Sequence, residues 1–376
     1  MTTTSELRGR LVLDDRVAAG RLRIEGDRIA SVDVDDAAEE SVAELPYLAP
    51  GFVDVHVHGW GGHSAMGDAQ ALDGMARALA RRGVTSFLPS AWSTPIPELH
   101  AFADRVRAWI PAAPADGAEP LGFNLEGPFI APKRKGAHNP AWLLEPASVP
   151  WSDIEPLVDG LRLTTVAPEI AGALELIGRL TSMGVRVAVG HSAATLAGAM
   201  AGYDAGGTTT THLFNAMTGI DHRAPGVVVA ALTRDDAYVE LIADGEHVDP
   251  SLWPIIMRTK PTDRLLLVSD AVSLAGMGDG ISDIGGLEVE VRGQRCTIIG
   301  ADTLAGSVIA LDSAVRNLVQ HGATLPNAVA AASRNPVEML GLSDRGRLAP
   351  GLRADVVELG KDLVVRRVMR GGDWVA

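Results

Sequence analysis

Eight short apolar runs, each ending in polar residues, constrain the fold of this chain more than any other feature. They cover residues 51–58, 84–91, 120–127, 162–169, 186–192, 208–214, 239–244 and 265–271. Apolar residues at helical spacing lie between most of these runs: Leu72, Met75 and Leu79; Leu99, Phe102 and Val106; and, with weaker periodicity, Leu174, Ile177 and Leu180. A strand followed by a helix eight times predicts an α/β fold, a (β/α)8 barrel of the TIM type.

The two ends of the chain have a different pattern. Residues 9–50 and the last thirty or so residues contain short strand-like runs separated by Gly and Asp turn signals. We therefore expect a small β-sandwich domain built from both termini, residues 1–50 and 345–376, beside a catalytic barrel of residues 51–344.

Ionisable side chains stand at the ends of the barrel runs, where a barrel of this type carries its reactive residues. They are His56, His58, Glu126, His191, His212 and Asp270. His56 and His58 are two apart in one strand, so their side chains face the same way. Two imidazoles placed like this can share one divalent ion.

Each of these residues alone has an ordinary structural explanation. A buried His can donate to a backbone carbonyl, and Asp270 could cap the next helix. Together at one rim, so many ionisable groups would be costly to bury without a cation. We therefore predict one or two divalent ions, with Zn²⁺ preferred and Fe²⁺, Mn²⁺ or Co²⁺ also suited to imidazole and carboxylate ligands. Asp270 could then act as the acid and base for hydrolysis.

The charge balance narrows the choice of partners. The formal net charge of −14 argues against nucleic acid and against anionic membrane surfaces, so an anionic substrate would need a local basic pocket. The sequence contains no run of about 18 apolar residues, so we expect no membrane-spanning helix. The single cysteine, Cys296, rules out an intrachain disulfide, and the N-terminus lacks a signal-peptide pattern. We expect a cytoplasmic protein.

Several motifs carry a family resemblance over nearly the whole chain. PGFVDVHVHG, GHS, THLFNAM and VSDA resemble the amidohydrolase superfamily. LEGPFIAPKRKGAHNP, HLFNAM followed by HRAPG, and ADGEHV resemble, more narrowly, the N-acetylglucosamine-6-phosphate deacetylases. The resemblance implies metal-dependent hydrolysis of the acetamide of N-acetylglucosamine 6-phosphate, in amino-sugar catabolism and cell-wall recycling.

The resemblance also implies roles for the strand-end residues. Glu126, His191 and His212 match the ligands of a retained metal. His56 and His58 match a pair that binds a second ion, with Glu126 as the bridge. Asp270 matches the catalytic acid and base.

The substrate contacts are implied in the same way. His138 matches a residue that contacts the sugar, and Asn215 and Ala216 match a segment that meets the substrate. Arg223 and His247 match phosphate-contacting residues that reach the site from a partner subunit. A functional homodimer is the corresponding expectation.

The chain departs from the family pattern in two loops. GWGGHSAMGD brings in Trp60 and His63, and Ala193 follows GHS where the family has Asp. The basic run from Lys133 to Lys135 could attract a phosphorylated sugar, or it could be an ordinary solvated run of charge.

Two rival functions stay open. One is an amidohydrolase acting on a different N-acetylated amino sugar, a cyclic amide or a nucleobase, and the other is a non-enzymatic scaffold.

Overall fold

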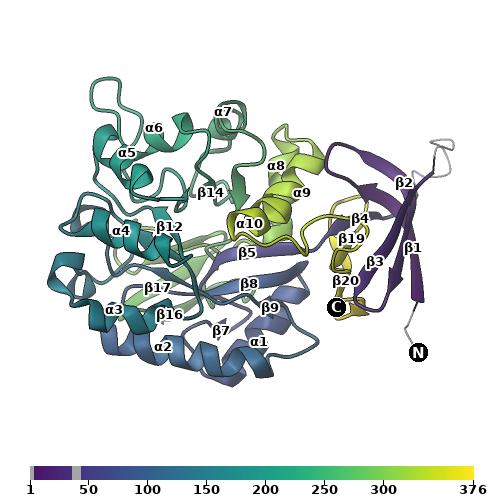
Figure 1. Ribbon diagram of the computed structural model, residues 1–376, viewed down its shortest axis with the longest axis horizontal. Coiled ribbons are helices and arrows are strands. Elements are labelled where there is room, and N and C mark those ends of the chain that lie inside the picture. The colour runs from purple at the N-terminus through teal and green to yellow at the C-terminus, as the bar shows by residue number, and fades with distance from the viewer. Residues whose placement is uncertain (1–3, 36–43) are drawn as a thin grey trace.

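The computed structural model describes residues 4–35 and 44–376, and it contains a parallel barrel beside a mixed sheet (Figure 1). Neighbouring strands in one hydrogen-bonded path are β5 (Phe52–Val57), β8 (Val84–Ala91), β10 (Phe123–Glu126), β11 (Leu161–Val166), β12 (Arg186–Val189) and β13 (Thr209–Thr210). A parallel pair, β14 (Val239–Leu241) and β15 (Leu265–Leu267), adds the last two. All eight predicted runs are therefore strands, and the predicted barrel is confirmed.

Backbone hydrogen bonds close the ring on both sides of the β14–β15 pair. The amide of Thr210 donates to the carbonyl of Tyr238 over 3.0 Å, which joins β13 to the start of β14. The amide of Asp270 donates to the carbonyl of His56 over 2.8 Å, which joins the segment after β15 to β5. Closure removes the free strand edges. It also brings the first and last segments of the barrel together at the rim.

A helix follows each barrel strand and packs against its outer face. In chain order these are α1 (Ala69–Ala80), α2 (Ile96–Trp109), α3 (Trp151–Val158), α4 (Ala173–Ser182), α5 (Leu196–Asp204), α6 (Val227–Thr233), α7 (Trp253–Thr259) and α8 (Leu311–Gln320), with α9 (Leu325–Ala332) and α10 (Arg334–Met339) after them. The predicted apolar stripes of α1 and α2 are buried. In α4 the predicted stripe is wrong at one position: Leu174 is exposed, and Leu176 is buried with Ile177 and Leu180.

Short strands decorate the barrel. The smallest are β6 (Gly59–Trp60), β7 (His63–Ser64) and β9 (Glu119–Pro120). An antiparallel sheet of β16 (Gly280–Ile284), β17 (Leu287–Arg292) and β18 (Arg295–Ile298) lies between β15 and α8 in the chain. Within the described ranges, no helix is long and apolar enough to cross a membrane.

The strands from the two ends form one mixed sheet at the side of the barrel (Figure 1). Its order is β21 (Asp373–Trp374), β20 (Val365–Arg370), β19 (Val356–Leu359), β4 (Tyr47–Pro50), β1 (Thr4–Val12), β2 (Val17–Glu25) and β3 (Arg28–Val34). It has a core of its own, which includes Leu11, Leu22, Ile29 and Met369. We propose that this sheet is the composite unit expected for residues 1–50 and 345–376, of which 1–3 and 36–43 lie outside the described residues.

A network of arginines and carboxylates joins this sheet to the barrel. Arg345 is almost buried, and its Nη1 donates to Ser86 Oγ on β8 and to Glu119 Oε2, both over 2.9 Å. Arg353 pairs with the same oxygen of Glu119 and, over 3.1 Å, with Asp355. Because two guanidinium groups share Glu119, its loss would leave both with less compensation in a region of low exposure.

We expect Glu119→Ala to lower the free energy of unfolding by ~2 kcal/mol, less than for a fully buried pair because the Glu119 side chain is 34% exposed. Urea unfolding followed by fluorescence measures the change. Asp116→Ala is the matched control, because Asp116 pairs with Arg77 on the surface and is 62% exposed. The control should lose far less stability, and equal losses in the two variants would contradict the prediction.

Candidate active site and metal centre

The predicted site residues meet at the carboxyl ends of the barrel strands. Glu126 is the last residue of β10, and His191, His212 and Asp270 each follow a strand by two or three residues. These three adopt positive φ angles of 45°, 26° and 50°. Such a conformation is strained for residues with a side chain, costing on the order of 1 kcal/mol each, and persists where the surrounding structure fixes the backbone.

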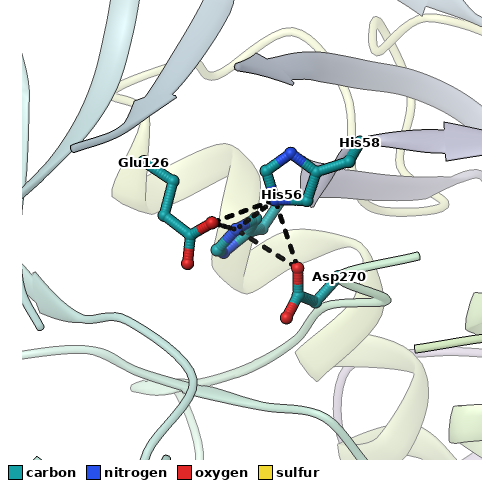
Figure 2. Close-up of side chains that lie close together, drawn as sticks. All are labelled: His56, His58, Glu126 and Asp270. Carbon is teal, nitrogen blue, oxygen red and sulfur yellow. Dashed lines mark hydrogen bonds and ion pairs between the residues drawn. The ribbon is translucent and has the colours of Figure 1, made fainter. Parts of the chain in front are cut away.

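The side chains form two clusters of possible metal ligands, and each cluster has its ligand atoms within 4.8 Å of one another. The His56 group contains His56, His58, Glu126 and Asp270, and Figure 2 shows their side chains converging. The His191 group contains Glu126, His191 and His212. The structure thus brings together the six residues that the sequence predicted at one rim, and Glu126 is common to both groups.

Glu126 belongs to both groups through different oxygens. Its Oε2 lies 3.1 Å from Nε2 of His58 in the His56 group. Its Oε1 lies 2.9 Å from Nε2 of His191 and 3.0 Å from Nε2 of His212. A carboxylate in this position can bridge two cations, one at each oxygen.

The outer nitrogens of three histidines have acceptors that set which nitrogen carries the proton. Nδ1 of His58 donates to the carbonyl of Ser90 over 3.0 Å, and Nδ1 of His191 donates to the carbonyl of Arg134 over 2.8 Å. Nδ1 of His56 donates to Glu240 over 3.1 Å. Each Nε2 then presents a lone pair to the site, as a metal ligand requires.

The donor set fits a divalent ion. Nε2 of His56 lies 3.3 Å from Nε2 of His58, and Nε2 of His191 lies 3.0 Å from Nε2 of His212. Two lone pairs this close repel each other unless a cation or a proton lies between them. Imidazole with carboxylate is the ligand chemistry of transition-metal sites, so these clusters are suited to a divalent metal.

Without a cation, the carboxylates hold protons on the His56 group. Burial by itself lowers the pKa of His58, but its hydrogen bonds to Asp270 and Glu126 outweigh this and raise the pKa to about 9. His56 behaves in the same way: burial opposes the charges of Asp270 and Glu126, yet its pKa lies well above the ordinary value. A metal entering this group must displace protons.

The two histidines of the His191 group differ from each other. Burial acts to lower the pKa of His212, but its hydrogen bond to Glu126 outweighs this and raises the pKa above the ordinary value. Burial lowers the pKa of His191 to about 4, despite its hydrogen bond to Glu126. Burial also acts to raise the pKa of Glu126, but the neighbouring imidazoles, His138 and His56 first, hold it well below the ordinary value. A neutral imidazole beside an ionised carboxylate is ready to bind a metal at neutral pH.

A cavity of about 390 Å³ opens over the two groups. Four of the five predicted substrate contacts line it: His138, Asn215, Ala216 and His247. His247 thus lines the cavity of its own chain, where we expected it to serve a partner's site. Arg223 is exposed on the loop before α6 and does not line the cavity. Lys133 and Arg134 of the basic run also line it.

His138 differs from the other site histidines in its tautomer. Its Nδ1 accepts a hydrogen bond from the backbone amide of Ser93 over 3.1 Å. The ring proton of neutral His138 is therefore on Nε2, which lies 3.3 Å from Oε2 of Glu126. The Nε2–H of His138 therefore faces Glu126 in the wall of the cavity, whereas Nδ1 is the atom that donates to a fixed acceptor in His56, His58 and His191.

The two departures from the family pattern lie outside this arrangement. Trp60 and His63 form the small β6–β7 hairpin, and neither lines the cavity. The backbone amide of Ala193 donates to Glu169, which also accepts from Ser192 Oγ over 2.7 Å. Glu169 thus anchors the loop after His191 without an acidic side chain at position 193.

Sequence reasoning missed two buried carboxylates beneath the site. Glu240 on β14 accepts from His56, and Asp54 on β5 accepts the backbone amides of His56 and Ser269 over 3.3 Å. Burial raises the pKa of Asp54 to about 6. The signal was an acid inside a strand run and not at its end, at a fully buried position: Asp54 two residues before His56, and Glu240 between Val239 and Leu241.

Comparisons with known proteins agree with this geometry. The model of the amidohydrolase family matches residues 47–375. N-acetylgalactosamine-6-phosphate deacetylase of Escherichia coli O157:H7 is 39% identical over 95% of this chain and 93% of its own. N-acetylglucosamine-6-phosphate deacetylase of Bos taurus is 37% identical over 87% of this chain and 83% of its own.

A solved structure has the same fold over its full length. It is a variant of N-acetyl-D-glucosamine-6-phosphate deacetylase from Mycobacterium smegmatis in complex with N-acetyl-D-glucosamine-6-phosphate. The two chains superpose with a TM-score of 0.91 at 35% identity, and the match covers 100% of each. The chain therefore belongs to the amidohydrolase family and, within it, to the N-acetylglucosamine-6-phosphate deacetylases.

Proposed function

We propose that this protein hydrolyses the acetamide of N-acetylglucosamine 6-phosphate to glucosamine 6-phosphate and acetate, as a step of amino-sugar metabolism. The observation that carries the proposal is the position of Asp270, a buried carboxylate in the cavity beside two clusters of metal ligands. Its Oδ1 lies 3.3 Å from Nε2 of His58 and 3.5 Å from Nε2 of His56.

Two steps of the reaction depend on the residues around the cavity. A bound divalent metal would lower the pKa of water to roughly 7 and polarise the amide carbonyl. Glu126, His191 and His212 would hold one ion, and His56 and His58 with Glu126 a second. Asp270 accepts a proton from the attacking water and then delivers it to the departing nitrogen. Burial acts to raise the pKa of Asp270, but the charge on His56 outweighs it and keeps the carboxylate ionised, as a base must be.

The rest of the cavity supplies recognition of the sugar. The Nε2–H of His138 can donate to an oxygen of the substrate, and Asn215 and Ala216 line the same wall. Lys133, Arg134 and His247 provide positive or donor groups for a phosphate in a protein of net charge −14. This local reversal of charge favours a phosphorylated substrate over a neutral one.

A homodimer is part of the proposal. Arg223 is exposed and lies outside its own cavity, together with Ile220, which is 61% exposed on the same loop. An exposed arginine beside an apolar side chain suits an interface, and guanidinium binds phosphate with two hydrogen bonds. We infer that Arg223 completes the phosphate site of the partner subunit.

Location in the cytoplasm is also part of the proposal. Cys296 is the single cysteine of the chain, so no intrachain disulfide stabilises the fold. Its side chain is buried, and burial raises the pKa of its thiol to about 12. A chain with one buried thiol and no disulfide is typical of proteins from reducing compartments.

A second substrate is favoured by one comparison. The Escherichia coli relative at 39% identity is a deacetylase of N-acetylgalactosamine 6-phosphate, a sugar that differs from the glucose form only in the orientation of one hydroxyl group. The two substrates place the same acetamide and phosphate in the site, so the proposed chemistry serves both.

We expect acetate release from N-acetylglucosamine 6-phosphate to exceed release from unphosphorylated N-acetylglucosamine by ~100-fold or more in kcat/KM, because only the phosphate engages the basic groups. A coupled acetate assay on both sugars, with N-acetylgalactosamine 6-phosphate as the third substrate, measures the preference. Equal rates with and without phosphate would refute the assigned substrate, and a higher rate on the galactose form would favour the second candidate.

We expect Asp270→Asn to lower kcat by roughly 10²–10⁴-fold, because the amide cannot accept and return a proton. Metal content, measured by elemental analysis, should stay near the wild-type level in the His191 group, which does not include Asp270. Asp235→Asn on the surface is a control for the loss of one charge. Turnover of the Asp270 variant at the wild-type rate would show that another group transfers the proton.

Subunit mixing tests the role of Arg223. Arg223→Ala and Asp270→Asn should each be nearly inactive alone, but a mixed dimer has one site with an intact Asp270 and the partner's intact arginine. Equal mixing after reversible dissociation should restore about one quarter of wild-type activity, because half of the dimers are mixed and each has one complete site. Failure to regain activity despite exchange of subunits would mean that Arg223 serves its own chain or no site.

A further inference from the structure

Glu240 is a fully buried carboxylate that contacts both metal groups, and no substrate or proton-transfer role uses it. It lies in the middle of β14 between Val239 and Leu241. We propose that Glu240 is a positioning residue that prepares His56 to bind a metal ion and thereby supports occupancy of the His56 group. The inference rests on the proposed function only in that a metal is what these groups hold.

One oxygen of Glu240 makes both contacts. Oε2 accepts from Nδ1 of His56 over 3.1 Å and from the backbone amide of His212 over 3.2 Å. His56 belongs to the His56 group and His212 to the His191 group. The rings of these two histidines are roughly parallel, with centroids 5.8 Å apart. Glu240 therefore fixes the orientation of one ligand relative to the backbone of another.

The contact with His56 has a chemical consequence. A carboxylate that accepts from the outer nitrogen of an imidazole fixes the tautomer and makes the inner nitrogen a stronger ligand. Nε2 of His56 is thus held with its lone pair toward the site, 3.5 Å from Asp270 and 3.7 Å from Glu126. His58 has only a neutral carbonyl as its acceptor, so His56 is the more basic of the pair by this criterion.

The charge of Glu240 needs a cation nearby. Among residues 4–35 and 44–376, the only side chain placed to form an ion pair with Glu240 is His56, which is charged only when protonated, and Oε1 of Glu240 has no hydrogen-bond partner. A buried carboxylate left in this way is unfavourable unless positive charge lies close to it. A divalent ion held by the His56 group would supply that charge, with the imidazole of His56 between it and Glu240.

A purely structural role is the alternative. Glu240 could serve the fold alone by accepting the amide of His212 at the end of β13. In that case its loss would lower stability but leave the affinity for metal unchanged, or lower it equally in both groups. Metal binding without substrate separates the two roles, and its result does not depend on which sugar the enzyme uses.

The test uses full-length, metal-free protein titrated with Co²⁺ and followed by visible absorption and calorimetry. Two backgrounds isolate the groups. His191→Ala leaves every residue of the His56 group in place, and His58→Ala leaves every residue of the His191 group in place. Glu126, which both groups share, is unchanged in both backgrounds. Adding Glu240→Ala should weaken Co²⁺ binding 10- to 100-fold in the first background. In the second background the change should be less than about threefold, because His212 ligates through its ring and not through its amide.

Two further variants complete the design. Asp312→Asn is the matched control, because Asp312 is equally buried and pairs with Arg82 and Arg316 far from either metal group in the chain; it should alter stability without altering Co²⁺ affinity. Glu240→Gln keeps the size and an acceptor but removes the charge, and we expect a several-fold loss in the first background. If the alanine variant does not fold, the glutamine variant decides, and wild-type Co²⁺ affinity in it would overturn the proposal. Equal losses in both backgrounds would also overturn it.

Discussion

The negative charge of Glu126, buried at the mouth of a closed barrel, is the constraint on which the rest of the site depends. A buried carboxylate must be compensated, and here no lysine or arginine in the described part of the chain pairs with it. Its partners are imidazoles, which are positively charged only when protonated and otherwise can bind a metal ion that carries the charge. The site is therefore built to be completed by a cation, and the two oxygens of Glu126 provide one place for it on each side.

The closed ring of strands holds these charged side chains together. The six site residues come from five different strands and reach one rim because parallel strands end at the same face. His191, His212 and Asp270 leave their strands in strained backbone conformations, and the hydrogen bonds between neighbouring strands hold them there. The stable barrel wall thus compensates for the backbone strain and for the cost of placing several charged side chains close together at its mouth.

Much of this was accessible from the sequence, because it depends on periodicity and position. Apolar runs with polar ends predicted eight strands, and the residues at those ends predicted the metal groups. Other features depend on contacts that periodicity does not encode. In the sequence Glu240 is an acid between two apolar residues of a strand. Its proposed role depends on a hydrogen bond from His56, which is distant in sequence. Leu174 faces solvent and Leu176, two positions later, faces the core, a difference that a weak repeat could not resolve. The antiparallel sheet β16–β18 is an insertion with no place in the strand–helix alternation.

The loop that bears the basic run has a further consequence for how this protein can diversify. Arg134 lines the cavity and its backbone carbonyl accepts the proton of His191, and Gly136 leaves room for that ring because a Cβ there would come within 3.0 Å of it. The segment that lines the cavity thus also positions His191, a candidate metal ligand. Insertions or deletions that retune it for another carbohydrate would disturb the imidazole at the same time. New specificities in this lineage should therefore arise by exchange of side chains on a loop of constant length.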